Sequence, residues 1–384
     1  MVRNPGPSAP DPVSFPLRRL GPAGKAALGL ALAPTLLALG EVVSRVGEAV
    51  SRAEEPLPYP PKRYAPYLLA ENAPNFRNES IEVDERGFRS KPFADRKPRG
   101  AFRLFLLGGS TAVGYGIRSN SETITGQLLR GLESRYPGRS FEVVNAAVSG
   151  HISTQELILL HTKVLRWDPD VVVVLDGRND FYFATSPRWR PHANDDVEAV
   201  ASLVEEATRS PLRALLRRSS LLRRLGLAAR SGGDPASRAV DPAGEERGEG
   251  RLRAEAVDLW ARNLKYMHEV ARSEGVRTFF LLQPSLTHTD KHLTEAERGL
   301  LRDLDRRPKT YVKGYARLSA ELFGEAARRV EELRASGIEA VDCRGIFGEE
   351  AGTVFTDECH LNALGNRHLA DLLLEYCSSG PLRG

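Results

Sequence analysis

Three residues that are far apart in the sequence have the types that acyl transfer requires. Ser110 follows two glycines in the stretch RLFLLGGSTAVGYG at residues 103–116. A serine hydroxyl is a weak nucleophile until a base takes its proton, and His360 is the candidate base. Asp357, three residues before His360, would hold the imidazole in one tautomer and stabilise its charged form. These three residues form the candidate catalytic set.

Two further positions could stabilise the negative charge that develops on the oxygen of an attacked carbonyl. Gly150 lies in the stretch NAAVSGHIS and Asn179 in GRND. The backbone N–H groups of Ser110 and Gly150 and the side-chain amide of Asn179 would supply three donors to this oxyanion hole. Loss of one such donor typically lowers a rate about 10²–10³-fold.

Three other polar residues near these stretches are candidates for the substrate rim. His151 follows Gly150 and could be a second acid or base, or simply a rim residue. Arg178 in GRND and Arg89 in RGFRS could contact the substrate, or could face solvent. A phosphate-binding loop is not expected, because no lysine follows the glycines of GGSTAVGYG.

Short apolar runs alternate with amphipathic segments, and these must position the candidate residues. We expect strands at 102–107, 140–146, 168–177, 276–284 and 337–343. We expect helices at 121–138, 153–167, 259–275, 315–337 and 360–377. Ser153 and Glu156 have the spacing of a capping box. Such alternation predicts a parallel sheet between two helical layers, an α/β fold of the three-layer α/β/α type. Five strands fit a flavodoxin-like, doubly wound order, with ligands beyond the carboxyl ends of the strands.

One segment interrupts this alternation. Residues 181–258 show no strand pattern; within them, 211–230 have the spacing of a basic amphipathic helix and 231–250 are typical of a flexible linker. Because this helical insertion follows the third strand, it should overhang the ligand end of the sheet. We expect a cap or lid whose leucines pack on the body, which spans 101–384. A helix on a membrane surface is the alternative, because its arginines suit anionic headgroups.

The N-terminal part reads as three segments. Residues 1–24 are rich in proline and glycine and are expected to be disordered. Residues 25–46 contain a short apolar run after several basic residues, which predicts a signal anchor or transmembrane helix with the body exported. A cleaved signal and a soluble amphipathic helix are the alternatives. Residues 47–100 are expected to be an irregular linker that packs on the body.

The composition limits the class of partner. The formal net charge is +4, and residues 1–25 hold four basic residues and one acidic residue, a net of +3, which leaves +1 for the rest. A nucleic-acid partner is not expected, because the body lacks a basic surface. Cys343, Cys359 and Cys377 are too few and too widely spaced for a zinc or disulfide framework. We expect three buried thiols, with one disulfide as the alternative.

The four stretches together resemble the SGNH, or GDSL-like, hydrolases, which are named for serine, glycine, asparagine and histidine in four blocks. GGST, NAAVSGHIS, GRND and DECH occur here in the family's order, between about residue 80 and residue 377. The chain departs from the commonest pattern because Gly109 stands where Gly-Asp-Ser has its aspartate. The apolar run at 25–46, the segment IEVDERGFRS at 81–90 and the form GGSTAVGYG resemble the membrane-anchored bacterial branch of this family.

This resemblance implies a serine esterase that needs neither a metal nor a cofactor. It would hydrolyse an acyl ester, in particular an O-acetyl ester, on a carbohydrate, cell-envelope or lipid substrate through an acyl-enzyme. The expected location is the cell envelope, with the N-terminal helix in the membrane. The same residues would serve an O-acyltransferase that moves an acetyl group to a sugar hydroxyl. A catalytically silent module that binds a glycan or a partner is a further alternative. The oligomeric state stays open.

Overall fold

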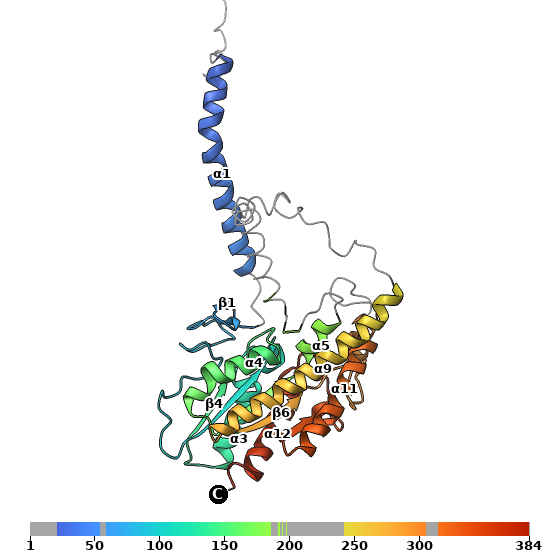
Figure 1. Ribbon diagram of the computed structural model, residues 1–384. Helices are drawn as coiled ribbons and strands as arrows, with labels where there is room; N and C mark the ends of the chain where they lie inside the picture. Colours follow the sequence, from blue (N-terminus) through green and yellow to red (C-terminus); the bar gives the residue numbers. More distant parts are fainter. Residues whose placement is uncertain are drawn as a thin grey trace, which may run out of the picture. The chain divides into compact units, whose positions relative to one another are not determined.

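The computed structural model describes residues 21–53, 59–185, 191–192, 194, 197, 242–304 and 314–383. The chain divides into two compact units, one formed by 1–55 with 204–238 and the other by 56–203 with 239–384. The second unit holds every candidate site residue (Figure 1). It adds residues 56–100 to the body predicted at 101–384 and leaves out 204–238, and it is called the body from here on. The predicted helix at 211–230 lies outside the described residues.

The first unit contains helix α1 (Pro22–Ala53), which includes the predicted anchor at 25–46 and Pro34. The helix begins inside the segment predicted to be disordered, so that prediction is wrong for the last residues of 1–24, while residues 1–20 lie outside the described part. Among the residues that the structure describes, no helix combines the length and the apolar composition that a membrane crossing needs.

The body is built on a five-stranded parallel sheet. Its strands are β3 (Phe102–Gly108), β4 (Phe141–Asn145), β5 (Val171–Asp176), β6 (Arg277–Leu282) and β7 (Ala340–Asp342). Their spatial order is β4-β3-β5-β6-β7, and each pairs with its neighbour in parallel. In chain order this is the 2-1-3-4-5 arrangement of a flavodoxin-like sheet, so the predicted fold class is confirmed.

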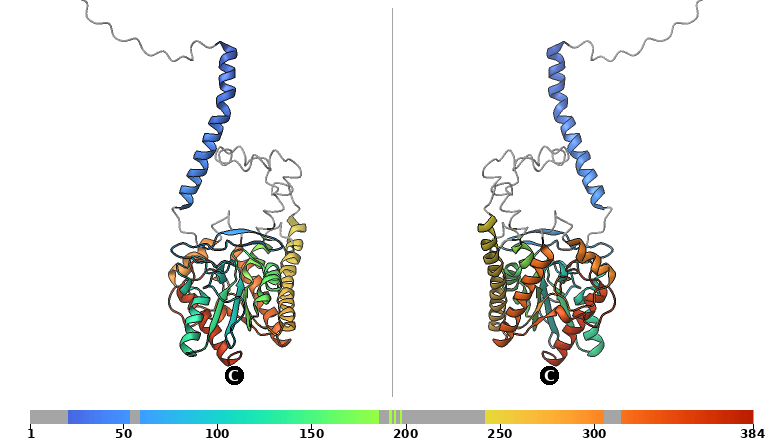
Figure 2. Two further views of the ribbon diagram at one scale, coloured as in Figure 1. Left: turned by 90° about the vertical axis from the view of Figure 1, so that its left-hand side faces the viewer. Right: turned by 90° about the vertical axis from the view of Figure 1, so that its right-hand side faces the viewer.

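Two helical layers cover the sheet (Figure 2). One contains α3 (Ile124–Arg135) and α12 (Ala363–Ser379); the other contains α4 (Ser153–Leu159), α9 (Pro242–Ser273) and α11 (Tyr315–Ala335). Successive strand side chains point to opposite faces. Val171 and Val173 therefore pack with the first layer, and Val172 and Val174 with the second. An apolar run without alternation is what a strand buried on both faces requires.

Several predicted boundaries are wrong. The helix predicted at 259–275 begins earlier, as α9 at Pro242, inside the predicted linker at 231–250. Helix α5 (Arg178–Ala184) extends into the start of the helical insertion predicted at 181–258. The helix predicted at 153–167 ends as α4 at Leu159 and continues as a π-helical turn (Leu160–Val164) and a 3-10 turn (Leu165–Trp167). Helix α10 (Glu295–Leu304) was not predicted.

The segment 47–100 is not wholly irregular. It contains a two-stranded antiparallel sheet of β1 (Lys62–Ala65) and β2 (Leu69–Asn72). Both strands have only four residues, too few for a clear sequence pattern. Leu68 at the turn and Phe88 and Phe93 further along are buried in the core shared with α4, α9 and α11.

Candidate active site

A sharp turn at the end of β3 presents Ser110. Gly108 has φ of +147°, and a Cβ there would lie 2.4 Å from the carbonyl oxygen of Leu175 and 2.5 Å from Cβ of Ala112. Only glycine allows this close approach of the chain to β5. Ser110 is the first residue of the short helix α2 (Ser110–Val113), where a backbone N–H has no acceptor within the helix.

The predicted catalytic residues meet at this turn. Nε2 of His360 lies 2.7 Å from Oγ of Ser110, and Nδ1 of His360 lies 2.6 Å from Oδ2 of Asp357. The other oxygen of Asp357 accepts from the N–H groups of Cys359 and His360 at 3.0 and 2.9 Å. Burial opposes ionisation of Asp357, but the hydrogen bond and charge of His360 and these N–H groups outweigh it and hold the pKa of Asp357 below its ordinary value.

Side-chain hydrogen bonds tie the His360 loop to the nucleophile turn. The hydroxyl of Thr111, next to Ser110, donates to the carbonyl of Cys359 at 3.2 Å. Gln283, which follows β6, donates to the Thr111 hydroxyl at 3.2 Å. These bonds hold the loop of His360 against the residues that follow β3 and β6, next to Ser110.

The predicted oxyanion donors lie beside the same turn. Nδ2 of Asn179 donates to the carbonyl oxygen of His151 at 2.6 Å, and it would lie 2.4 Å from a Cβ added to Gly109. Gly150 has φ of +85°, a conformation that glycine adopts without strain. In the described part of the chain, the Gly150 N–H donates to no backbone carbonyl. The structure thus brings the asparagine amide against the residue that precedes the nucleophile.

An aromatic stack braces His360, and sequence reasoning missed it. The ring of Tyr115 stacks on the imidazole of His360, with centroids 4.0 Å apart and planes at 17°. Tyr59 stacks on Tyr115 at 5.5 Å. Burial and the charge of Asp357 raise the pKa of Tyr115. The only sequence signal was an aromatic residue five positions after Ser110.

Two predicted rim residues are buried instead. Arg89 is 1% exposed, and its guanidinium donates to the carbonyls of Val113, Gly114 and Ile117. Burial lowers the pKa of Arg89 to about 10. The rim prediction for Arg89 is wrong because the side chain holds the turn that follows α2.

His151 is also wrong as a rim residue or as a second acid or base. It is fully buried, and its Nε2 lies 2.9 Å from the carbonyl oxygen of Ala70 in β2. Its contribution to the site is its own backbone carbonyl, which orients Asn179. Arg178 does not face solvent either, because it pairs with Glu358.

Three carboxylic acids lie buried next to the oxyanion donor. Glu156 comes from α4, Asp176 ends β5 and Asp180 follows Asn179 in α5; the three are at most 5% exposed. Asp180 accepts the Ser153 hydroxyl at 2.6 Å and the Ser153 N–H at 3.0 Å. The signal in the sequence was a pair of aspartates at the end of a strand buried on both faces.

These contacts overturn the capping box predicted for Ser153 and Glu156. Both side chains belong to the carboxyl cluster, and the cap residue of α4 is Ile152. Its N–H is accepted by Oε1 of Gln155 at 3.3 Å. The Ser153 hydroxyl bonds to Asp180 instead, and the Glu156 carboxyl is fully buried, so neither side chain caps α4.

Burial raises the pKa of all three carboxyls, and repulsion among them raises the pKa of Glu156 and of Asp176 further. The pKa of Asp180 rises to about 6. Within the described residues, the groups that dominate these shifts include no cation. Burial and mutual repulsion therefore favour the protonated forms of these carboxyls.

We expect the contribution of this carboxyl cluster to the free energy of unfolding of the body to decrease as the pH rises. Between the ordinary aspartate pKa of 3.8 and about 6, the folded state keeps a proton that the unfolded chain has released. The unfolded state then binds fewer protons, so stability falls with increasing pH, by about 1.4 kcal/mol per pH unit for each such proton. Urea unfolding across this range should show the unaltered chain losing stability relative to Glu156→Gln as the pH rises. The exposed Glu274→Gln after α9 is the control, and identical pH dependences for Glu156→Gln and the control would contradict the expectation.

One group of potential metal ligands lies in the described part of the chain. Ligand atoms of Asp357, Cys359 and His360 all lie within 4.8 Å of one another. Asp357 and His360 already bond to each other, and burial raises the pKa of the Cys359 thiol, which keeps it protonated. Cys343, Cys359 and Cys377 are free and buried, which confirms the predicted thiols. A reaction without metal or cofactor stays a prediction.

Comparison with known proteins identifies the family. The sequence model of the GDSL-like Lipase/Acylhydrolase family matches residues 106–368, more than half of the chain. The chain therefore belongs to this family and is an ester hydrolase. The search of curated proteins found no match.

Three solved structures illustrate the similarity of this chain to known proteins, each at low sequence identity. A lipase/acylhydrolase from Enterococcus faecalis is 14% identical, with 72% of this chain and 96% of that chain covered and a TM-score of 0.38. A GDSL-like lipase from Bacteroides thetaiotaomicron is 12% identical, with 74% and 93% covered and a TM-score of 0.34. An acetylxylan esterase from Geobacillus stearothermophilus is 12% identical, with 71% and 93% covered and a TM-score of 0.38. The family assignment rests on the sequence match. The membrane-anchored branch stays a prediction.

Proposed function

We propose that this chain is a serine esterase that removes a short acyl group, in particular acetyl, from an oxygen ester of a carbohydrate, cell-envelope or lipid substrate. The observation that carries the proposal is the continuous series of hydrogen bonds from Asp357 through His360 to Ser110. A nucleophile, a base and a residue that orients the base stand in the order that acyl transfer needs. A module that only binds would have no use for this arrangement.

The reaction would proceed through an acyl-enzyme. Oγ of Ser110 attacks the ester carbonyl and its proton passes to Nε2 of His360. The resulting oxyanion accepts from Nδ2 of Asn179 and from the N–H groups of Ser110 and Gly150. As the bond to the alcohol breaks, His360 returns the proton to the leaving oxygen. Water then attacks the acyl-serine with His360 again as base, which releases the acid and restores the hydroxyl of Ser110.

Asp357 has two roles in this scheme. Its Oδ2 keeps the proton of His360 on Nδ1, so that Nε2 faces Ser110 as the acceptor. Its charge stabilises the imidazolium that forms in both halves of the reaction. The lowered pKa of Asp357 keeps this carboxylate ionised throughout the neutral range.

The test is hydrolysis of p-nitrophenyl esters of increasing chain length, with acetylated xylan as a carbohydrate substrate. We expect p-nitrophenyl acetate to be cleaved fastest, and a fluorophosphonate to label Ser110 and stop turnover. No cleavage of any ester by folded protein, or labelling at another serine, would exclude the proposal. A sugar acceptor added to the reaction distinguishes transfer from hydrolysis through the products. A location in the cell envelope stays a prediction from residues 25–46.

A further inference from the structure

Arg178 contacts both the oxyanion donor Asn179 and the loop that carries Asp357 and His360. Its Nε donates to Oε1 of Glu358 at 2.8 Å, and its Nη2 donates to the same oxygen. Its Nη1 donates to Oδ1 of Asn179 at 3.2 Å. The guanidinium carbon lies 4.0 Å from the centroid of the Tyr182 ring. One planar side chain thus contacts the oxyanion amide, the His360 loop and helix α5.

Glu358 is a fixed anchor for this arginine. Its side chain is 2% exposed, against 17% for Arg178. Its backbone carbonyl accepts from the N–H of Leu286 at 2.7 Å and from the hydroxyl of Ser285 at 3.3 Å. Tyr315 of α11 adds a side-chain hydrogen bond to the carboxylate, and burial raises the pKa of that tyrosine, so it donates. Glu358 lies between Asp357 and His360 in the sequence, so the contacts that hold Glu358 also hold the loop that carries these two residues.

We propose that Arg178 is a positioning residue, which aligns the Asn179 amide with the Asp357–His360 loop by bonding to both Asn179 and Glu358. This inference rests on the proposed function. It replaces the sequence prediction that Arg178 contacts substrate.

The amide of Asn179 has two ends, and only one can serve an oxyanion. The terminal torsion of asparagine is broad and nearly two-fold, so side-chain packing alone does not choose the end. Arg178 donates to the oxygen, and the carbonyl of His151 accepts from the nitrogen. Both bonds favour the orientation that points N–H, rather than the lone pairs of the oxygen, at developing negative charge. Arg178 acts through Asn179 and does not need to touch the substrate.

A double-mutant cycle tests the coupling. Arg178→Met should lower kcat about 10–100-fold, less than the loss of a whole oxyanion donor, and should leave KM within about twofold, because alignment matters for the transition state. In an Asn179→Ala background the same change should lower kcat less than about threefold, since the residue that Arg178 aligns is gone. Arg178→Lys should resemble Arg178→Met, because one ammonium group cannot reproduce the planar fork.

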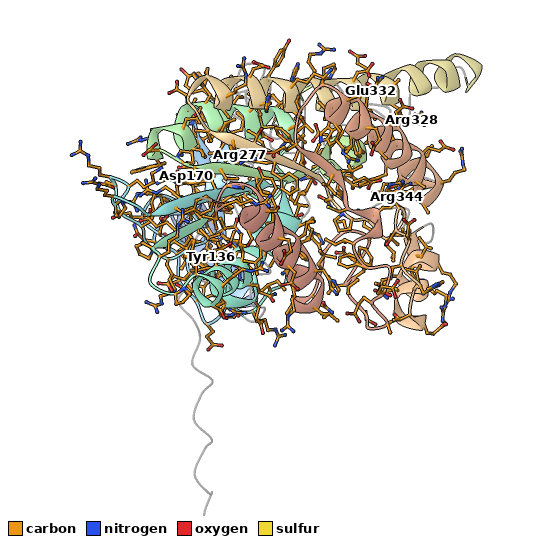
Figure 3. All side chains as sticks on the ribbon, turned by 90° about the horizontal axis from the view of Figure 1, so that it is seen from below. Tyr136, Asp170, Arg277, Arg328, Glu332 and Arg344 are labelled. Carbon is orange, nitrogen blue, oxygen red and sulfur yellow. The ribbon has the colours of Figure 1, made fainter. Side chains whose placement is uncertain are left out.

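Arg277→Met is the matched control. Arg277 begins β6 at the amino end of the sheet, where its N–H donates to the backbone carbonyl of Asp170 (Figure 3). Its side chain forms a half-exposed ion pair with Glu339. Like Arg178→Met, the Arg277→Met variant loses an arginine–glutamate ion pair. The lost pair, however, is at the opposite end of the strands from the active site. We expect its kcat to remain that of the unaltered chain.

Removal of Arg178 alone leaves the carboxylate of Glu358 buried without its cation, which can unfold a protein. The variant Arg178→Met/Glu358→Met removes both charges, and thermal unfolding will show that it is folded. It should show the same fall in kcat with KM preserved. A folded double variant with normal kcat would overturn the proposal, as would an additive cycle or a fully active Arg178→Lys. An unaltered chain without esterase activity would refute the proposed function instead.

Discussion

Replacing Ser110 by alanine should lower kcat for p-nitrophenyl acetate about 10⁴–10⁶-fold, because no other group can form the acyl-enzyme at this position. His360→Ala should cost a similar factor. The two residues act as one unit through the 2.7 Å hydrogen bond between Oγ and Nε2, so the double variant should be no slower than either single variant. Steady-state hydrolysis of the same ester with equal amounts of folded protein measures all three.

The control for this prediction is Ser273→Ala at the end of α9. The Ser273 hydroxyl is exposed and donates only to the carbonyl of Val270 among the described contacts, so activity should be unchanged. If Ser110→Ala retained more than a few per cent of the rate, the nucleophile would have to be another residue. A double variant much slower than both singles would show that Ser110 and His360 act independently.

Gly109→Ala should lower kcat about 10²-fold or more. The added Cβ would lie 2.4 Å from Nδ2 of Asn179, closer than a carbon and a nitrogen can approach, so the amide must leave its place. Loss of an oxyanion donor costs about 10²–10³-fold. Asn179→Ala should therefore show a similar loss, and Gly109→Ala should add little to it. Gly109→Asp, which restores the family's commonest residue, should be at least as inactive as Gly109→Ala.

Gly324→Ala is the matched control because Gly324 lies inside α11 with no atom within 4 Å of the added Cβ. It should keep full activity and raise the free energy of unfolding by about 0.5–1 kcal/mol, since alanine is the better helix former. Full activity of Gly109→Ala would contradict the close contact with Asn179. An increase in KM with unchanged kcat would show that Gly109 affects binding of the substrate rather than stabilisation of the oxyanion.

The sequence alone was enough for the parallel sheet. The run VVVV at 171–174 has no polar position, so both faces of that strand must be buried, and helices must supply the cover. The turn residues GGS and GRND lie at the carboxyl ends of β3 and β5, whereas DECH lies in the loop between β7 and α12. Because parallel strands end at one edge, Ser110, Asn179 and His360 could be expected together before any distance was known.

The β1–β2 hairpin and the beginning of α9 could not be predicted from the sequence pattern. β1 and β2 have four residues each, and Ala65 and Leu68 are buried in the core shared with α4, α9 and α11. The first residues of α9 read as a polar linker because glycine and proline lower helix propensity, yet the helix continues back to Pro242.

Side-chain partners were decided only by the tertiary structure. Arg89 and Arg178 look alike in the sequence, but one donates to the carbonyls after α2 and the other to Glu358 and Asn179. Tyr115 reaches His360 across 245 positions of chain. Periodicity indicates which apolar residues are buried and which edge of the sheet the strands reach, since those follow from local geometry. The acceptor that each buried donor finds depends on which distant segments fold against it, and no local pattern records that.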